Sequence, residues 1–158
     1  MAVSNIRIRP MRIEDIEKVA ELAMLANPCA EKEAYKKHLI EELRLNPELS
    51  MVAVNNKDEV IGYAQANIRE KMAILEDIAV SEGWQGKGVG GKLLEKEIEM
   101  LKEKGVKIVR AEVHYKCAEA IPFYYKFGFR ISGFEQDYFG IGQDAIILKL
   151  ELRENEDS

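Results

Sequence analysis

Cysteine is scarce in this sequence, which holds only Cys29 and Cys117 in 158 residues. Two cysteines cannot form the disulfide framework that stabilises many small secreted domains. They also lack the C-x-x-C spacing that is typical of zinc sites. The sequence therefore predicts two thiols in a reducing compartment, and it gives no indication of a structural metal.

The chain also lacks an excess of positive charge and a long apolar run. The sequence contains 23 Lys and Arg residues and 28 Asp and Glu residues, for a net charge of −5. This negative charge disfavours general binding to nucleic acid. No apolar stretch approaches the ~18 residues that a membrane span requires, and no signal peptide precedes the first expected strand. We therefore expect a cytoplasmic protein with neither nucleic acid nor membrane as a partner.

What remains is the composition of an ordinary globular domain. Hydrophobic residues make up 47% of the chain and charged residues 32%, and the length suits one domain with a core of its own. We expect a single domain over residues 1–152, followed by a polar tail over residues 153–158.

Hydrophobic periodicity and turn signals predict eleven elements in the order β-α-α-β-β-β-α-β-α-β-β. Strands are expected at residues 3–9, 51–54, 60–67, 72–80, 106–113, 130–138 and 145–152, and helices at 13–26, 30–45, 92–104 and 119–127. Antiparallel hairpins surround one β-α-β unit. This order predicts an α+β fold with a mixed, mostly antiparallel sheet of seven strands flanked by four helices.

A glycine-rich loop, Gln85–Gly91, stands between an expected strand and the helix that follows it. Glycine is costly to order, and it is tolerated where backbone N–H groups must approach a ligand closely. A glycine turn that opens a helix directs free N–H groups and the positive end of the helix dipole at one place. The loop therefore predicts a binding site for a phosphorylated ligand.

Two common nucleotide-binding motifs fit this loop poorly. A Walker motif needs Ser or Thr after Gly-Lys, and here Leu93 follows Lys92. Gly86, Gly88 and Gly91 do satisfy the Rossmann pattern G-x-G-x-x-G, with an acidic residue about 20 positions further on. However, half the chain precedes the loop, two acidic residues interrupt the strand before it, and no further β-α-β unit follows.

Two segments, one after the other in the sequence, favour a third interpretation of the glycine-rich loop. Leu75-Glu76-Asp77-Ile78-Ala79-Val80, followed by Gln85–Gly90, resembles the acetyl-CoA motif of the GNAT superfamily of N-acetyltransferases, which is Gln/Arg-x-x-Gly-x-Gly/Ala after a strand. Ala120–Phe129 resembles a second motif of that family, A-x-x-[FL]-Y-x-K-x-G-F. The resemblance extends from Met72 to Leu150, and the earlier residues match only in element order and in an opening Ile-Arg-x-Arg-Pro followed by Asp15.

The resemblance implies acetyl-CoA as cosubstrate, without a metal. The pyrophosphate would lie on the backbone amides of the loop, and the pantetheine arm would pair with the preceding strand. Cys117 takes the position of an asparagine that commonly contacts CoA in the family. The residues implied for CoA are Ile78, Ala79, Val80, Gln85, Gly86, Lys87, Gly88, Val89, Gly90, Gly91, Cys117 and Tyr124.

The resemblance also implies catalytic residues. Tyr124 falls on the tyrosine of the second motif, where a phenol protonates the departing CoA thiolate. A carboxylate must deprotonate the acceptor amine, which is mostly ammonium at neutral pH. Glu112, in a segment similar to the Leu-Glu-Val-Arg of bacterial ribosomal-protein-alanine acetyltransferases, is the first candidate for this base. Glu76 is the second candidate.

The acceptor is less well defined. Tyr138, with Asp144-Ala145 after it, matches a region that lines the peptide entrance of N-terminal α-amine acetyltransferases. We therefore expect a protein N-terminus as acceptor, with a polyamine or another small amine as the alternative. A CoA-binding module without catalysis is the rival from another class, and an exposed edge strand would permit a homodimer.

Overall fold

The computed structural model describes residues 5–26 and 30–153, and the chain forms two compact units. The first comprises the chain up to Asn67 together with Glu76–Leu101, and the second comprises Ile68–Leu75 and the chain from Lys102 onward. Cys29 and most of the expected C-terminal tail lie outside the described residues. None of the helices within the described ranges is long and apolar enough to cross a membrane.

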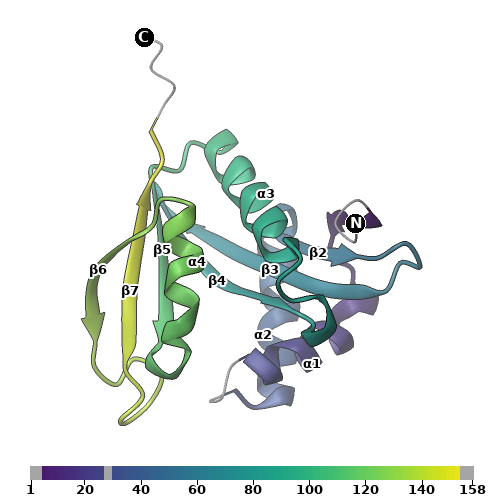
Figure 1. The fold of residues 1–158 in the computed structure, drawn as a ribbon, viewed down its shortest axis with the longest axis horizontal. Helices are drawn as coiled ribbons and strands as arrows, with labels where there is room; N and C mark the ends of the chain where they lie inside the picture. Colours follow the sequence, from purple (N-terminus) through teal and green to yellow (C-terminus); the bar gives the residue numbers. More distant parts are fainter. Residues whose placement is uncertain (1–4, 27–29, 154–158) are drawn as a thin grey trace. The chain divides into compact units, whose positions relative to one another are not determined.

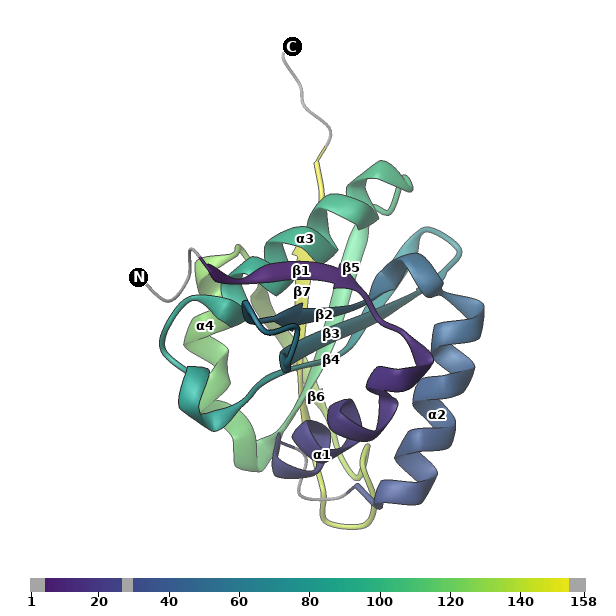
Figure 2. The ribbon, with the colours of Figure 1, turned by 90° about the vertical axis from the view of Figure 1, so that its right-hand side faces the viewer.

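The first unit holds three helices and the strands β1 to β3. Its elements are β1 (Arg7–Pro10), α1 (Ile16–Ala26), α2 (Lys32–Leu45), β2 (Ser50–Val54), β3 (Val60–Arg69, up to Asn67), the end of β4 (Met72–Val80) and α3 (Val89–Glu103), with short 3-10 turns η2 (Ile13–Asp15), η3 (Pro47–Leu49) and η4 (Glu82–Trp84). β1 pairs antiparallel with β2, and β2 pairs antiparallel with β3. Helices α1 and α2 cover one face of these strands and α3 covers the other (Figure 2).

Alternation along β2 sends side chains into a separate core on each face. Val52 and Val54 pack with α1 and with Leu39 of α2. Met51 and Ala53 pack on the opposite face with residues of α3, including Leu93. Both sets are almost completely buried, because a strand between two helical layers has no face left for water.

A close approach at Gly62 fixes the position of α3. A Cβ atom at Gly62 would lie 3.1 Å from the carbonyl oxygen of Ala79 and 3.2 Å from Cδ1 of Leu93. Both distances are shorter than ordinary carbon contacts, so only glycine lets α3 and β4 approach β3 this closely. The start of α3, and with it the glycine loop, is therefore positioned by a tight backbone contact.

A buried ion pair connects β1 to the start of α1. The guanidinium of Arg9 donates to both carboxylate oxygens of Asp15 at 2.8 and 3.0 Å, and both side chains are 8% exposed. Burial raises the pKa of the Asp15 carboxyl, but the hydrogen bonds from Arg9 and from the Arg12 backbone outweigh it and hold the pKa below its usual value. The opening Ile-Arg-x-Arg-Pro with Asp15 is thus a structural anchor.

The second unit is a smaller sheet with one helix (Figure 1). Its elements are the start of β4, β5 (Ile108–His114), the 3-10 segment η5 (Tyr115–Ala120), α4 (Ile121–Lys126), β6 (Arg130–Glu135) and β7 (Ala145–Glu151). The first four residues of β4 pair parallel with Ile108–Ala111, β5 pairs antiparallel with β7, and β7 pairs antiparallel with β6. Phe129 and Leu148 are fully buried in this unit.

The strand order confirms the expected fold class. One sheet has the order β1-β2-β3-β4-β5-β7-β6, with a single parallel pair between β4 and β5 among the pairs with an assigned register. With four α-helices in the described chain, this is the predicted seven-stranded, mostly antiparallel α+β fold.

Several predicted boundaries were wrong by a few residues. The helix expected from Lys92 begins at Val89, because buried Val89 packs on β3 and this contact outweighs the poor helix propensity of Gly90 and Gly91. The first strand begins at Arg7, and residues 3–4 of its predicted range are not described. The strand expected to reach residue 138 ends at Glu135, because a turn with Asp137 at φ +59° follows.

One buried carboxyl has no hydrogen-bonding partner. Glu97, on α3, is 0% exposed, and neither carboxyl oxygen makes a hydrogen bond among the described residues. Burial raises the pKa of this carboxyl well above its usual value, because the charged form cannot be solvated. The folded protein therefore holds a proton on Glu97 that the unfolded chain releases at a lower pH.

This carboxyl predicts a pH-dependent cost to stability. Because the folded state binds the extra proton, the free energy of unfolding should fall as the pH rises above the ordinary glutamate pKa, by at most about 1.4 kcal/mol per pH unit. Glu97→Gln should flatten this part of the curve, measured by urea unfolding across pH. Glu95→Gln, at an exposed position of the same helix, is the matched control. Equal slopes for wild type and Glu97→Gln would contradict the assignment.

Candidate functional site

The glycine loop has the backbone geometry of an anion-binding turn. Gly86 and Gly88 have φ values of +76° and +86°, in the left-handed region that favours glycine. The N–H of Lys92 donates to the carbonyl of Gly88 at 3.1 Å, so this bond closes the first turn of α3. The amides at the start of α3 precede the first intrahelical donors and point out of the helix end.

Side chains around the loop leave its outer face open. A Cβ atom at Gly86 would meet nothing within 4 Å, and the side-chain amide of Gln85 donates back to the carbonyl of Val80 at 3.0 Å. The ammonium of Lys87 lies 5.5 Å from the ring centroid of Trp84. The loop is thus stabilised by its own hydrogen bond from Gln85 to Val80. Its exposed amides and the nearby ammonium of Lys87 suit a phosphate group.

The strand before the loop carries the residues expected to meet the pantetheine arm. Pairing of β4 with β5 covers Met72–Leu75, and Ile78, Ala79 and Val80 come after this segment. The N–H of Ile78 donates to Oδ1 of Asp77 at 3.0 Å. A ligand that binds this amide must therefore compete with the neighbouring carboxylate.

Glu76, the second candidate base, is held from two elements of the first unit. The side-chain amide of Asn67, on β3, donates to Oε2 of Glu76. Nε2 of His38, on α2, lies 3.8 Å from Oε1. The Glu76 side chain is 24% exposed, so water reaches it, as a base for a soluble amine requires.

Asp77 was not among the predicted site residues, and its carboxylate accepts hydrogen bonds from three donors. Its Oδ2 accepts from the hydroxyl of Tyr35, on α2, and from that of Tyr63, on β3, the latter at 2.5 Å. Burial raises the pKa of the Asp77 carboxyl, and the two tyrosine hydrogen bonds act in the opposite direction without cancelling it. A regular strand alternates its faces, yet Glu76 and Asp77 both reach α2, so β4 departs from regular alternation here.

Glu112, the first candidate base, lies in the second unit as one half of an ion pair. Its Oε2 accepts from Nε of Arg110 at 2.6 Å, and its side chain is 8% exposed. Arg110 also lies 3.4 Å from Glu135 of β6. Glu112 is therefore a positioned carboxylate with a permanent counter-charge.

Tyr124 is buried within an aromatic cluster of the second unit. It is 8% exposed, and its ring makes edge contacts with Phe123 and Phe129 at centroid distances of 5.3 and 5.4 Å. These contacts fix the orientation of the Tyr124 ring. A general acid that donates to the sulfur atom of CoA would need such a fixed orientation. Cys117 lies in the preceding segment η5, at a non-helical kink, and is half-buried.

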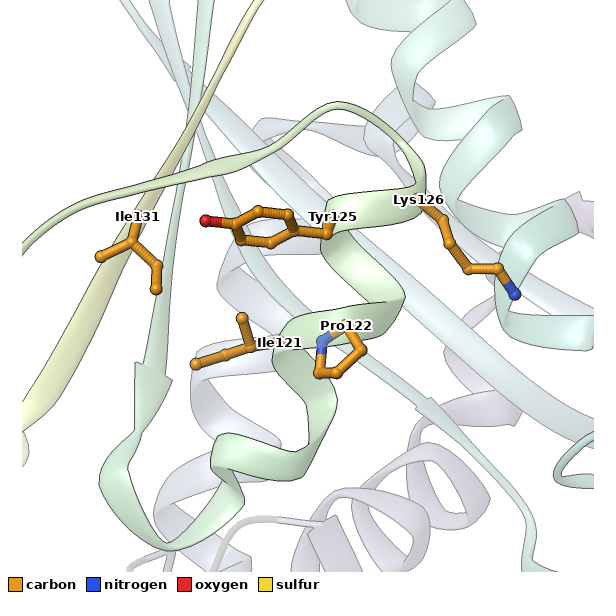
Figure 3. A pocket seen from close by; sticks show the side chains of 5 residues that line it. All are labelled: Ile121, Pro122, Tyr125, Lys126 and Ile131. Atoms are coloured by element: carbon orange, nitrogen blue, oxygen red, sulfur yellow. The ribbon is translucent and has the colours of Figure 1, made fainter.

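Tyr125, the residue after Tyr124 on α4, lines an open apolar hollow with Ile121, Pro122, Lys126 and Ile131 (Figure 3). Figure 3 shows its ring directed towards Ile131, and the guanidinium of Arg130 lies 4.9 Å from the ring centroid. Apart from the phenol of Tyr125 and the ammonium of Lys126, the described lining of this hollow is apolar.

Tyr138 lies in the loop between β6 and β7. It is 42% exposed, and its ring meets that of Phe139 edge to face at 4.9 Å. The loop is tied down by Gln143, whose side chain lies 2.7 Å from Nε2 of His114. Tyr138 is therefore accessible on an ordered loop.

The predicted residues thus fall into two groups, one in each unit. Glu76, the end of β4 and the glycine loop belong to the first, and Glu112, Cys117, Tyr124 and Tyr138 belong to the second. Sequence reasoning missed the set Tyr35, Tyr63, Asn67 and Asp77. The available signal was the pair Glu76-Asp77 in the middle of a strand whose other residues are apolar, which is unusual unless hydroxyls or amides meet these carboxylates.

Comparisons with known proteins agree with this geometry. A model of the acetyltransferase (GNAT) family matches residues 16–129. The chain is 27% identical over 150 residues to a putative [ribosomal protein bS18]-alanine N-acetyltransferase of Bacillus subtilis, covering 93% of this chain and 96% of the other. It is 35% identical over 101 residues to the [ribosomal protein bS18]-alanine N-acetyltransferase of Escherichia coli strain K12, covering 62% of this chain and 67% of that protein.

A solved structure, Ard1 from Thermoplasma volcanium, is similar with a TM-score of 0.86 at 26% identity, covering 95% of this chain and 99% of the other. The family match covers more than half of the chain, from α1 to the end of the second motif. This match, the fold and the glycine turn together show that the chain belongs to the GNAT family of acetyltransferases.

Proposed function

We propose that this enzyme acetylates the α-amine at the N-terminus of a protein. Acetyl-CoA is the donor, as in the family to which the chain belongs. The observation that carries the acceptor is the set of relatives that match over most of the chain, because their names specify ribosomal-protein alanine, N-alpha or N-terminal acetylation.

The first unit supplies the proposed donor site. The amides from Gly86 to Gly91 would hold the pyrophosphate, with the charge of Lys87 nearby. Backbone groups of Ile78–Val80 would hold the pantetheine arm, since these residues come after the segment of β4 that pairs with β5. From the second unit, Cys117 would contact CoA in the place of the family's asparagine.

The second unit supplies the proposed chemistry. The acceptor ammonium loses a proton to a carboxylate and attacks the thioester carbonyl. The C–S bond then breaks, and Tyr124 protonates the departing thiolate. Glu112 is the proposed base, because its ion pair with Arg110 holds it in one position, and Glu76 is the alternative. Tyr138 would line the acceptor entrance.

Further parts of the proposal rest on the sequence. They are a single catalytic domain over residues 1–152 ahead of the tail, a cytoplasmic location, and the absence of nucleic-acid and membrane partners. The exposed edge strand β6 is compatible with a homodimer.

A direct assay tests the acceptor. Release of CoA thiol should occur with acetyl-CoA and peptides that have free N-termini, and it should disappear when the peptide N-terminus is blocked. Polyamines serve as the comparison. If only polyamines cause thiol release, the acceptor is a small amine and not a protein α-amine. If the protein binds CoA but no acceptor causes release, the proposed enzymatic function is wrong.

Tyr124 has its own test. Tyr124→Phe should lower kcat by about 10²-fold, the scale of a lost general acid, while the Kd for acetyl-CoA stays within about twofold, because the ring and its packing remain. Steady-state kinetics and calorimetry measure the two quantities. Tyr125→Phe, on the same helix and 40% exposed, is the matched control, and an unchanged kcat in Tyr124→Phe would remove this residue from the acid role.

The two candidate bases are distinguished by paired variants. Glu112→Gln should lower kcat by about 10²-fold, and Glu76→Gln should have a smaller effect. Thermal unfolding of Glu112→Gln measures the cost of removing this partner of Arg110, which keeps its contact with Glu135. The reverse order of the two effects, in variants that remain folded, would assign the base to Glu76.

A further inference from the structure

Strand β6 of the second unit is exposed along its whole length. It is the last strand in the sheet order, so one edge of its backbone pairs with β7 and the other pairs with no strand of the described chain (Figure 1). All six of its residues are exposed. Natural proteins often protect such an edge with charged residues, proline or a bulge, because it is a template for another strand. The middle of β6 holds Ser132 and Gly133, which leave the backbone accessible.

The order of residues along β6 is complementary to itself. From one end to the other the strand has a cation, an apolar residue, two small residues, an apolar residue and an anion, namely Arg130, Ile131, Ser132, Gly133, Phe134 and Glu135. If a second copy lies antiparallel, with a two-fold axis between Ser132 and Gly133, Arg130 lies opposite Glu135 and Ile131 lies opposite Phe134. Opposite charges and aromatic–aliphatic pairs are combinations that stabilise opposed strands. The symmetry makes each of these pairs occur twice.

A bulge in β6 puts its two large apolar residues on the same face of the sheet. The register with β7 shifts at Ser132, which is therefore the extra residue of the bulge. Ile131 lies opposite Leu148, and Phe134 lies opposite Ile146. Because Leu148 and Ile146 are two residues apart on β7, they share a face, and so do Ile131 and Phe134. Without the bulge the two would point to opposite faces and could not meet across the axis.

The charged residues of β6 share the other face of the sheet. Arg130 lies opposite Lys149 and Glu135 lies opposite Ala145, and these two positions of β7 are four residues apart. Lys149 also lies opposite Arg110 of β5, so three cations form a row across the strands that ends at the edge. Glu135 of a second copy would extend this row with an anion. The Glu135 side chain is 54% exposed beside its contact with Arg110.

The apolar face of the edge has room for an aromatic ring. Ile131 borders the open hollow that Tyr125, Ile121 and Pro122 also line (Figure 3). Ile131 is 52% exposed and Phe134 is 71% exposed, although both are apolar. In the symmetric pairing, Phe134 of the second copy lies opposite Ile131, next to this hollow. Its ring would cover apolar side chains that otherwise meet water.

We propose that β6 pairs with β6 of a second copy of this chain, antiparallel, about a two-fold axis between Ser132 and Gly133. The occupant of the edge is a second copy because the strand complements itself in charge, in size and in apolar character in one register. Both chains use the same surface, so the assembly closes as a dimer. The pairing gives the homodimer of the proposed function its interface, and it does not depend on acetyl transfer.

Charge reversal tests the pairing. Arg130→Glu and Glu135→Arg should each raise the dimer Kd by at least about tenfold, because each variant turns two attractive pairs into two repulsive ones. Sedimentation equilibrium measures this Kd. A mixture of the two variants should dimerise again, since every pair in the mixed dimer joins opposite charges. The double variant should also dimerise, because it exchanges the two charges.

The control and the contrary outcomes are equally direct. Glu119→Arg makes the same change of charge at an exposed position of η5, and it should leave the dimer Kd within about twofold. Wild type that stays monomeric at about 0.1 mM would overturn the pairing and leave the edge to solvent or to another protein. A mixture that dimerises no better than its components would also overturn it. If wild type dimerises as expected but acetylates no amine, the proposed activity fails and the pairing stands.

Discussion

The close contact of α3 and β4 with β3 at Gly62 is the constraint on which the donor site depends. With no side chain at this position, the carbonyl of Ala79 and the side chain of Leu93 approach the strand directly. The same contact buries Val89, the first residue of α3, so the helix begins immediately after the left-handed turn at Gly88. The amides proposed to hold the phosphate are therefore positioned by core packing rather than by the loop's own stiffness.

The opposite face of β3 is organised by a different requirement. Tyr63 lies in an apolar core with Val52 and Leu39, and its hydroxyl needs a partner because an unpaired polar group there is costly. Asp77 satisfies it and also satisfies Tyr35. One carboxylate thus connects α2, β3 and β4, at the residue before Ile78. Burial raises the pKa of this carboxyl, and the hydrogen bonds that satisfy the two hydroxyls act against that shift.

Element order and the glycine loop could be predicted from sequence because both depend on local patterns. Alternating apolar residues predict β4 with its bounds unchanged, and the left-handed glycines confirm the turn. The start of α3 could not be predicted, since the packing of Val89 decides it. The partners of Asp77 were also hidden, because Tyr35 and Tyr63 are distant in sequence and Tyr35 shares its helix face with apolar residues.

The carboxylates differ in the partners that hold them. Glu112 accepts from the guanidinium of Arg110 at 2.6 Å, so its partner carries a full positive charge. Asp77 has two hydroxyls and no cation among its hydrogen-bonding partners in the described chain, and burial raises the pKa of its carboxyl. Each carboxyl is thus satisfied within its own unit, Glu112 by an ion pair and Asp77 by neutral donors.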